Sequence, residues 1–270
     1  ISLLSLNVIY SNAKLETCSR SDANFDKCLK GAIQNALTMF EKGIPEYNIP
    51  PMQPLTVPEW TINGIPPMNF DHVYKNLRLY NYPLSTITNV ISKINENEFN
   101  LHIDAYNSLL NGKGDYIYNG FVVNGVDISS EGQIDYSYHG VTLRANMTGE
   151  VTDRVVIKSF KLYVVDFKEF SLEYISEDKD KALATQKFVS ENATTIVHTE
   201  EKLYLALYSS ALQNYTNSVF NGFSFEELQR MNPLSIVAPE DRQQAFDQIQ
   251  TNQTVALDIS LTVGSVTESV

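Results

Sequence analysis

Few residues in this sequence have the spacing that catalysis or metal binding requires. The four histidines, His72, His102, His139 and His198, lie far apart, and no nucleophile elbow, His-Glu-x-x-His helix, phosphate-binding loop or dinucleotide fingerprint is present. His102 and Asp104 are two residues apart, so one face of a strand could present both as metal ligands, although such residues on a polar face are more often simply solvated. We therefore expect no metal and no cofactor, and catalysis only through residues that folding brings together.

Cys18 and Cys28 are the two cysteines of the chain, too few for a structural zinc site or a disulfide-rich scaffold. In an oxidising compartment they would close a short loop and contribute roughly 2 to 3 kcal/mol in the loop-entropy model. In the cytosol they would remain two free thiols. Masses measured with and without reduction distinguish the two cases.

Four asparagines begin an Asn-x-Ser/Thr sequence and could accept a glycan in a secreted protein. The chain is so rich in Asn, Ser and Thr that about this many such sequences would arise by chance, so they permit glycosylation without demanding it. The four are Asn146, Asn192, Asn214 and Asn252.

Composition excludes several classes of partner. The chain has 270 residues, a net charge of -12 and 43% hydrophobic residues, enough for a substantial core. Because its charge would repel phosphate groups, we expect no nucleic-acid partner, and no apolar run is long enough to predict a membrane span. Residues 1–13 are apolar and end in small residues, which fits either the remnant of a secretory signal or an N-terminal strand.

The segment from Cys18 to Gly43 has the clearest helix signal. Asp22 or Asn24 can cap its first turn, and Gly43 can end it in the left-handed conformation. Its apolar residues recur at i, i+3, i+4 and i+7, which predicts an amphipathic helix that covers another element. The stripe consists of Phe25, Cys28, Leu29, Ala32, Ile33, Ala36, Leu37 and Phe40.

A proline-rich segment, residues 43–67, follows this helix. Because proline fixes φ, we expect it to run as an extended strap rather than as a helix. Met52 and Trp60 belong to its apolar side, where Trp60 could line a cavity or contribute ordinary packing.

From Phe70 to Tyr174 the hydrophobic period falls to two, which predicts an antiparallel meander with one apolar face. The stretch 99–106 shows it well, since Phe99, Leu101 and Ile103 alternate with polar residues. Similar alternation occurs over residues 74–82, 116–126, 134–145, 151–165 and 167–175. Turn signals occur at residues 111–114, 124–125, 130–132 and 177–180.

The last part of the sequence returns to a helical period. A long helix is expected over Glu200–Phe220, with a short helix at 225–231, another at 238–250 and a final strand at 255–263. At 1.5 Å per residue the long helix would span about 30 Å, the length of a domain.

The helix that begins near Cys18 and the proline-rich strap after it resemble the takeout and juvenile-hormone-binding family of secreted insect proteins. A looser resemblance lies in the glycine-spaced strand pair around Gly114, Tyr116, Gly120, Gly125 and Gly132, and together the two cover roughly residues 18–175, with weak similarity to about residue 220. The matching residues of the helix and strap are Cys18, Cys28, Leu29, Gly43, Ile44, Pro45, Glu46, Ile49, Pro50, Pro54 and Leu55.

The resemblance implies an α+β fold in which a highly curved antiparallel sheet wraps a long helix and encloses a tunnel for an apolar ligand. It implies a takeout-like domain over residues 18–232, preceded by an N-terminal segment, 1–17, and followed by an extension, 233–270. It also favours a disulfide between Cys18 and Cys28 and secretion into an extracellular fluid such as haemolymph. The expected ligand-lining residues are Leu37, Phe40, Met52, Trp60, Phe99, Phe121, Tyr136, Tyr138, Val141, Leu207 and Tyr215.

The resulting hypothesis is a secreted carrier of a hydrophobic small molecule, such as juvenile hormone, another terpenoid, a fatty acid or a carotenoid-like pigment, without catalysis. Tyrosine hydroxyls are the expected polar contacts, because a phenol packs as a hydrocarbon and offers one hydrogen bond. The alternatives are a ligand-free storage or interaction glycoprotein of the same fold and, less favoured, a hydrolase acting on esters of such ligands. A protein receptor or an oligomeric assembly is a possible further partner.

Overall fold

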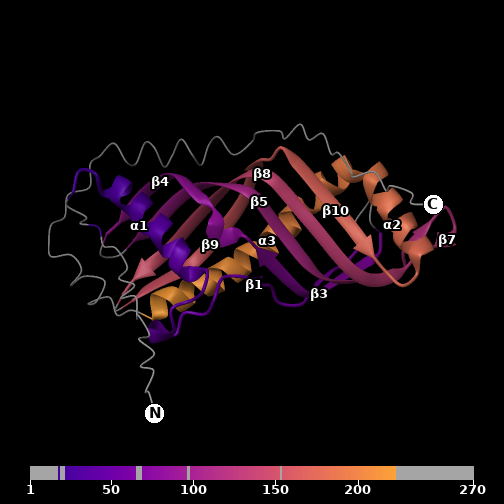
Figure 1. Ribbon diagram of the computed structural model, residues 1–270, viewed down its shortest axis with the longest axis horizontal. Helices are drawn as coiled ribbons and strands as arrows, with labels where there is room; N and C mark the ends of the chain where they lie inside the picture. Colours follow the sequence, from indigo (N-terminus) through magenta and orange to yellow (C-terminus); the bar gives the residue numbers. More distant parts are fainter. Residues whose placement is uncertain (1–17, 19–21, 65–68, 96–97, 153, 223–270) are drawn as a thin grey trace, which may run out of the picture.

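Two long antiparallel strands form the centre of the molecule (Figure 1). The computed structural model describes residues 18, 22–64, 69–95, 98–152 and 154–222. Strand β5 (Phe99–Asn119) pairs with β8 (Ser130–Val151), and each pairs on its other side with two shorter strands placed end to end. The sheet is therefore four strands wide over most of its length and antiparallel throughout.

The shorter strands divide the sheet into two ends. At one end β4 (Thr86–Ile94) pairs with the first half of β5, and β9 (Val155–Asp166) pairs with the second half of β8. At the other end β3 (Asp71–Tyr80) and β10 (Glu169–Ile175) occupy the same places. The strap adds β1 (Leu55–Thr56) and β2 (Trp60–Ile62) to β3, and β6 (Val122–Val123) with β7 (Val126–Asp127) forms a separate hairpin.

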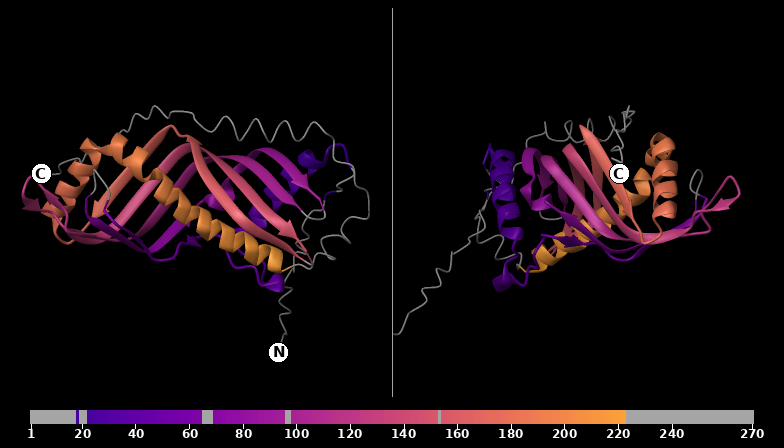
Figure 2. Two further views of the ribbon diagram at one scale, coloured as in Figure 1. Left: turned by 180° about the vertical axis from the view of Figure 1, so that it is seen from behind. Right: turned by 45° about the vertical axis from the view of Figure 1, so that its right-hand side comes forward.

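Three helices complete the fold. Helix α3 (Ala193–Asn221) runs diagonally across the strands, while α1 (Phe25–Phe40) lies at the β4 end and α2 (Lys179–Glu191) at the β10 end (Figure 2). Two 3₁₀ turns, η1 (Pro45–Tyr47) and η2 (Tyr82–Leu84), follow α1 and β3. A curved antiparallel sheet around a long helix is the fold that the family resemblance implied. Among the described residues, no helix combines the length and the hydropathy needed to cross a membrane.

Helix α1 is fastened to the unpaired edge of β4 by side chains spaced four residues apart. Gln34 accepts a hydrogen bond from the Ile87 N–H at 2.8 Å and donates one to the Ser85 carbonyl at 3.0 Å. Lys30 Nζ donates to the Thr88 carbonyl, and Asp26 accepts from the Ser92 hydroxyl. An open strand edge invites pairing with another chain, so these contacts both hold the helix and protect the edge.

Helix α3 covers the opposite edge, that of β9, in the same way. Ser209 Oγ accepts from the Leu162 N–H at 2.9 Å, and Asn217 Oδ1 accepts from the Ile157 N–H at 2.8 Å. Gln213, between them in the sequence, donates to the Ile157 carbonyl. On each edge strand of this end, backbone groups thus form hydrogen bonds with polar side chains at positions i, i+4 and i+8 of a helix.

Two of the turn predictions were wrong. Residues 111–114 lie inside β5, and residues 130–132 begin β8. The glycines there allow close packing instead of reversing the chain: a Cβ on Gly112 would collide with the Tyr136 ring, and one on Gly132 with the Ile175 carbonyl. The predicted turn at Asn124 and Gly125 is present between β6 and β7, with φ of 51° and 81°.

The helical predictions were incomplete rather than misplaced. Helix α1 begins at Phe25 and ends at Phe40, the first and last residues of the predicted apolar stripe. Gly43 has the expected left-handed conformation, with a φ of 74°. Helix α3 starts earlier than Glu200, and the whole of α2 was missed, because the expected turn at 177–180 is its first turn, capped by Asp178. The elements expected at 225–231, 238–250 and 255–263, and segment 1–17, lie outside the described residues.

The polar row on α1 predicts a stability effect. Gln34→Ala leaves the Ile87 N–H and the Ser85 carbonyl without their partner, so we expect a loss of about 1 to 3 kcal/mol in the free energy of unfolding by urea. Hydrogen exchange at the Ile87 amide should accelerate. Thr38→Ala, one turn later on an exposed position of the same helix, is the control, with a change within about 0.5 kcal/mol. Equal effects of the two substitutions would contradict the fastening role.

Candidate ligand-binding cavity

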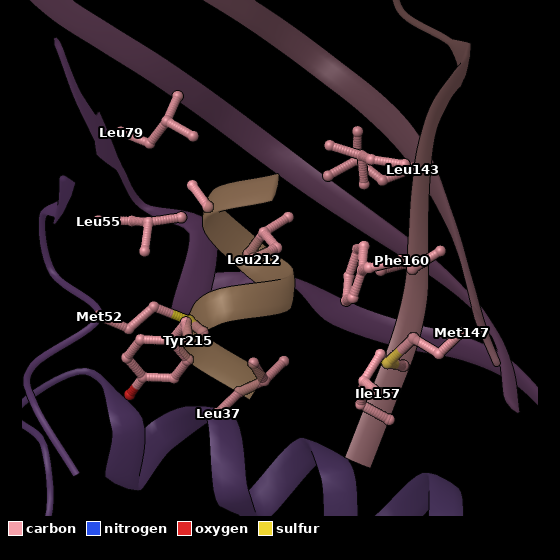
Figure 3. Packing of buried hydrophobic residues seen from close by; sticks show 14 of the residues in the cluster. Leu37, Met52, Leu55, Leu79, Leu143, Met147, Ile157, Phe160, Leu212 and Tyr215 are labelled. Atoms are coloured by element: carbon pink, nitrogen blue, oxygen red, sulfur yellow. The ribbon is translucent and has the colours of Figure 1, made fainter. Parts of the chain in front are cut away.

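A cavity of about 370 Å³, partly open to solvent, lies at the β4 end of the molecule. Its walls come from α1, the strap, η2, the four strands of this end and the last turns of α3. Figure 3 shows Leu37, Met52 and Tyr215 on one side of this region and Leu143, Met147 and Phe160 on the other, with Leu212 of α3 between them. The other lining residues are Cys18, Leu29, Ala32, Ile33, Ala36, Phe40, Tyr82, Ser85, Ile87, Ile94, Phe99, Leu101, Ile103, Ala105, Ala145, Leu162, Thr216, Val219 and Phe220.

Alanines on facing walls explain why the space is not filled. Ala32 and Ala36 lie one helical turn apart in α1, and Ala105 and Ala145 belong to neighbouring strands β5 and β8. Both walls are held apart at fixed positions by the polar rows at the sheet edges. With short side chains on each wall, a void remains that larger residues would have closed.

The described lining contains no charged side chain and only four hydroxyl groups. Three of these hydroxyls donate to a protein carbonyl: Ser85 to Tyr82, Thr216 to Leu212, and Tyr215 to Pro50 at 2.9 Å. The fourth belongs to Tyr82. Such a site suits an uncharged apolar molecule, because an ion would lose its hydration without gaining a partner.

The β10 end of the interior is filled by aromatic rings. Phe70 stacks on Phe121 with ring centroids 3.7 Å apart, and Tyr118 is 1% exposed. The tyrosine hydroxyls there bond to one another: Tyr118 with Tyr174 at 2.8 Å and with Tyr74 at 3.0 Å, and Tyr74 with Tyr204 at 2.8 Å. A pocket does adjoin these rings, and its lining includes Tyr116 and Tyr118, but it also includes charged side chains such as Lys75, Asp115 and Glu131, unlike the cavity at the β4 end.

The sequence pattern of the family described as Haemolymph juvenile hormone binding protein matches residues 2–230, most of the chain. The chain belongs to this family. No curated protein sequence matches it. Takeout 1 of Epiphyas postvittana is structurally similar, with a TM-score of 0.64 at 16% identity over 81% of this chain and 100% of that one. Lipopolysaccharide binding protein has a TM-score of 0.36 at 12% identity, covering 70% and 38% of the two chains.

The likeness to Takeout 1 is one of fold alone, and it confirms the α+β architecture of a curved antiparallel sheet around a long helix. The printed description of the family is that of a binding protein. The disulfide that the family resemblance implied is present, since Cys18 and Cys28 are bonded to each other.

The cavity brings together five of the residues expected to contact a ligand, and six lie elsewhere. Tyr136, Val141 and Leu207 are buried in the core but do not line the cavity. Tyr138 packs against Phe170, with ring centroids 4.7 Å apart. Trp60 lies on β2, half-buried between the two ends, and Phe121 belongs to the aromatic end. The five at the cavity are Leu37, Phe40, Met52, Phe99 and Tyr215.

Several cavity residues were missed by the sequence-based list. The four alanines and Tyr82 are the most important. A usable signal was present for two of them, because Ala32 and Ala36 interrupt an otherwise bulky stripe of α1. For Ala105, Ala145 and Tyr82 the position depends on strand register and on the turn after β3, which the sequence pattern did not specify.

His102 and Asp104 form a buried polar cluster rather than an open pair of metal ligands. His102 Nε2 lies 3.3 Å from Asp104 Oδ1, Arg144 donates to the same oxygen at 2.8 Å, and His102 Nδ1 lies 2.7 Å from Asn146 Oδ1. Burial would raise the pKa of Asp104, but the hydrogen bonds from His102 and Arg144 outweigh it and hold that pKa well below its usual range. The guanidinium occupies the position a cation would need.

The predicted glycosylation sites differ in their surroundings. Asn214 is exposed on α3. Asn146 is half-buried beside His102, and Asn192 donates to the Phe188 carbonyl at the junction of α2 and α3. Asn252 lies outside the described residues, and glycosylation stays a prediction for all four.

Filling the cavity should cost little stability. In Ala105→Phe the added ring enters the void, so we expect the free energy of unfolding to change by less than about 1 kcal/mol. The same exchange at Ala211, which is buried in α3 away from the cavity, should destabilise by about 1 to 3 kcal/mol through overpacking. Urea denaturation of both variants checks the difference. A larger loss at Ala105 than at Ala211 would mean that the cavity does not exist in solution.

Proposed function

We propose that this protein is a secreted carrier that holds one hydrophobic small molecule in the cavity under α1 and does not alter it chemically. The observation that supports this most is an interior space of about 370 Å³ bounded by apolar side chains and by no charged one among the described lining residues. Small-molecule sites commonly measure about 300 to 1,000 Å³, so the space suits a single compact ligand. Candidate ligands are juvenile hormone, another terpenoid, a fatty acid or a carotenoid-like pigment.

The energetics of such a site are sufficient for a carrier. Burying about 400 Å² of apolar ligand surface at roughly 25 cal/mol per Å² contributes about 10 kcal/mol. Association costs at least about 4 kcal/mol, which leaves about 6 kcal/mol and a Kd in the tens of micromolar. Each hydrogen bond to the ligand would tighten binding further.

Secretion is supported by two observations. The disulfide between Cys18 and Cys28 is a bond that persists in oxidising compartments. The family is described by its place in haemolymph. A circulating carrier for a poorly soluble molecule fits both.

A hydrolytic function finds little support in this cavity. Its described lining includes no histidine and no carboxylate, so neither Ser85 nor Thr216 has a base to activate it. A ligand-free storage or interaction role would need no cavity at all. We therefore place the carrier first.

The proposal predicts bound or bindable lipid. Native mass spectrometry and organic extraction of protein from its natural source should reveal an apolar molecule at up to one per chain. Delipidated protein should bind an uncharged fluorescent naphthylamine, and Ala105→Phe should weaken this binding at least tenfold while Ala211→Phe, if folded, retains it. Unchanged binding in Ala105→Phe, or none in the wild type, would overturn the proposal.

A further inference from the structure

We propose that Tyr82 is the hydrogen-bonding anchor of the cavity, so that the preferred ligand is uncharged and presents one acceptor oxygen, such as an ester, ketone or epoxide. This inference rests on the proposed carrier function and deepens it. It assigns a polar contact to a residue outside the set expected from the sequence, and it separates ligands that a purely apolar cavity would not distinguish.

Tyr82 differs from the other hydroxyl residues of the lining in having its proton uncommitted. The hydroxyls of Ser85, Tyr215 and Thr216 donate to carbonyl oxygens of the protein. No hydrogen bond joins the Tyr82 hydroxyl to the described part of the chain. The Tyr82 hydroxyl is therefore free to donate a hydrogen bond to a ligand oxygen.

Tyr82 is half-buried and is one of the residues that line the cavity. Burial raises the pKa of its phenol, so the hydroxyl stays protonated and able to donate at physiological pH. Because Tyr82 belongs to the lining, part of its remaining surface faces the cavity.

A network of amide side chains fixes the turn that bears Tyr82. Asn107, which is 2% exposed, donates to the Asn81 carbonyl at 2.7 Å and to Ser85 Oγ at 3.0 Å. Gln53 of the strap accepts from the Asn81 N–H at 2.8 Å. Gln34 of α1 donates to the Ser85 carbonyl. Contacts from three elements thus fix η2, as a preorganised ligand contact requires.

The lack of charge in the lining sets the ligand class. A carboxylate placed beside Tyr82 would gain one hydrogen bond but lose its hydration, with no cationic side chain among the described lining residues to compensate. A neutral acceptor gains the same bond at far lower desolvation cost. We therefore expect discrimination between an ester and the corresponding ionised acid.

The test compares two ligands and two tyrosine variants by displacement of the naphthylamine probe. Methyl palmitate offers an acceptor oxygen and hexadecane offers none. Tyr82→Phe should weaken the affinity for methyl palmitate about three- to tenfold, because one hydrogen bond is lost. The affinity for hexadecane should not change. Tyr215→Phe is the matched control, because the Tyr215 ring lines the same cavity but its hydroxyl bonds to the Pro50 carbonyl. The affinities for the two ligands should therefore change by the same factor in this variant.

The outcomes separate this inference from the carrier function. If the wild type binds neither ligand, both are overturned. If both ligands bind and Tyr82→Phe changes the two affinities equally, or changes neither, only the anchoring role of Tyr82 is overturned. Ionised palmitate at alkaline pH should bind more weakly than methyl palmitate, and equal binding would overturn the preference for a neutral ligand. The unfolding free energy of Tyr82→Phe should not fall, since a loss would reveal a protein partner for the hydroxyl.

Discussion

The open edges of the sheet are the constraint on which this structure depends. Strands β4 and β9 have unpaired backbone groups at opposite sides of the same end, and an exposed strand edge is a site for unwanted association. The chain covers each edge with a helix that hydrogen-bonds to it through side chains four residues apart. Gln34 does so from α1, and Asn217 from α3.

This way of closing the sheet also explains why an interior space exists. A helix fixed by its polar flank to a strand edge cannot move inward to fill every gap beneath its apolar stripe. Where the facing residues are large, as around Leu207 and Tyr136, the side chains are buried against one another. Where they are Ala36 and Ala105, a cavity remains. The apolar cavity therefore lies at the β4 end, where the facing side chains are small.

The hydroxyl groups of the two ends differ in their partners. At the aromatic end Tyr74, Tyr118 and Tyr174 bond to one another, so these three hydroxyls are buried at little cost. Burial there also lowers the pKa of His72 to about 4, so this histidine is neutral at physiological pH. At the cavity the Tyr82 hydroxyl has no such partner among the described residues and is available to a ligand.

The sequence by itself determined the local structure and the class of fold. The stripe of α1 and the period-two alternation of the strands predicted an amphipathic helix and an antiparallel sheet, because these signals depend on residues close together in the chain. The wrapping of that sheet around a long helix was implied by the family resemblance. The glycines at 112 and 132 were wrongly predicted to form turns. In the sequence, a glycine needed for close approach to a distant part of the chain cannot be distinguished from one needed for a turn. The sites of the void and of Tyr82 were decided only by tertiary structure. They depend on strand register and on which residues of α1, β5 and β8 face each other, and no short stretch of sequence encodes such a distance between walls.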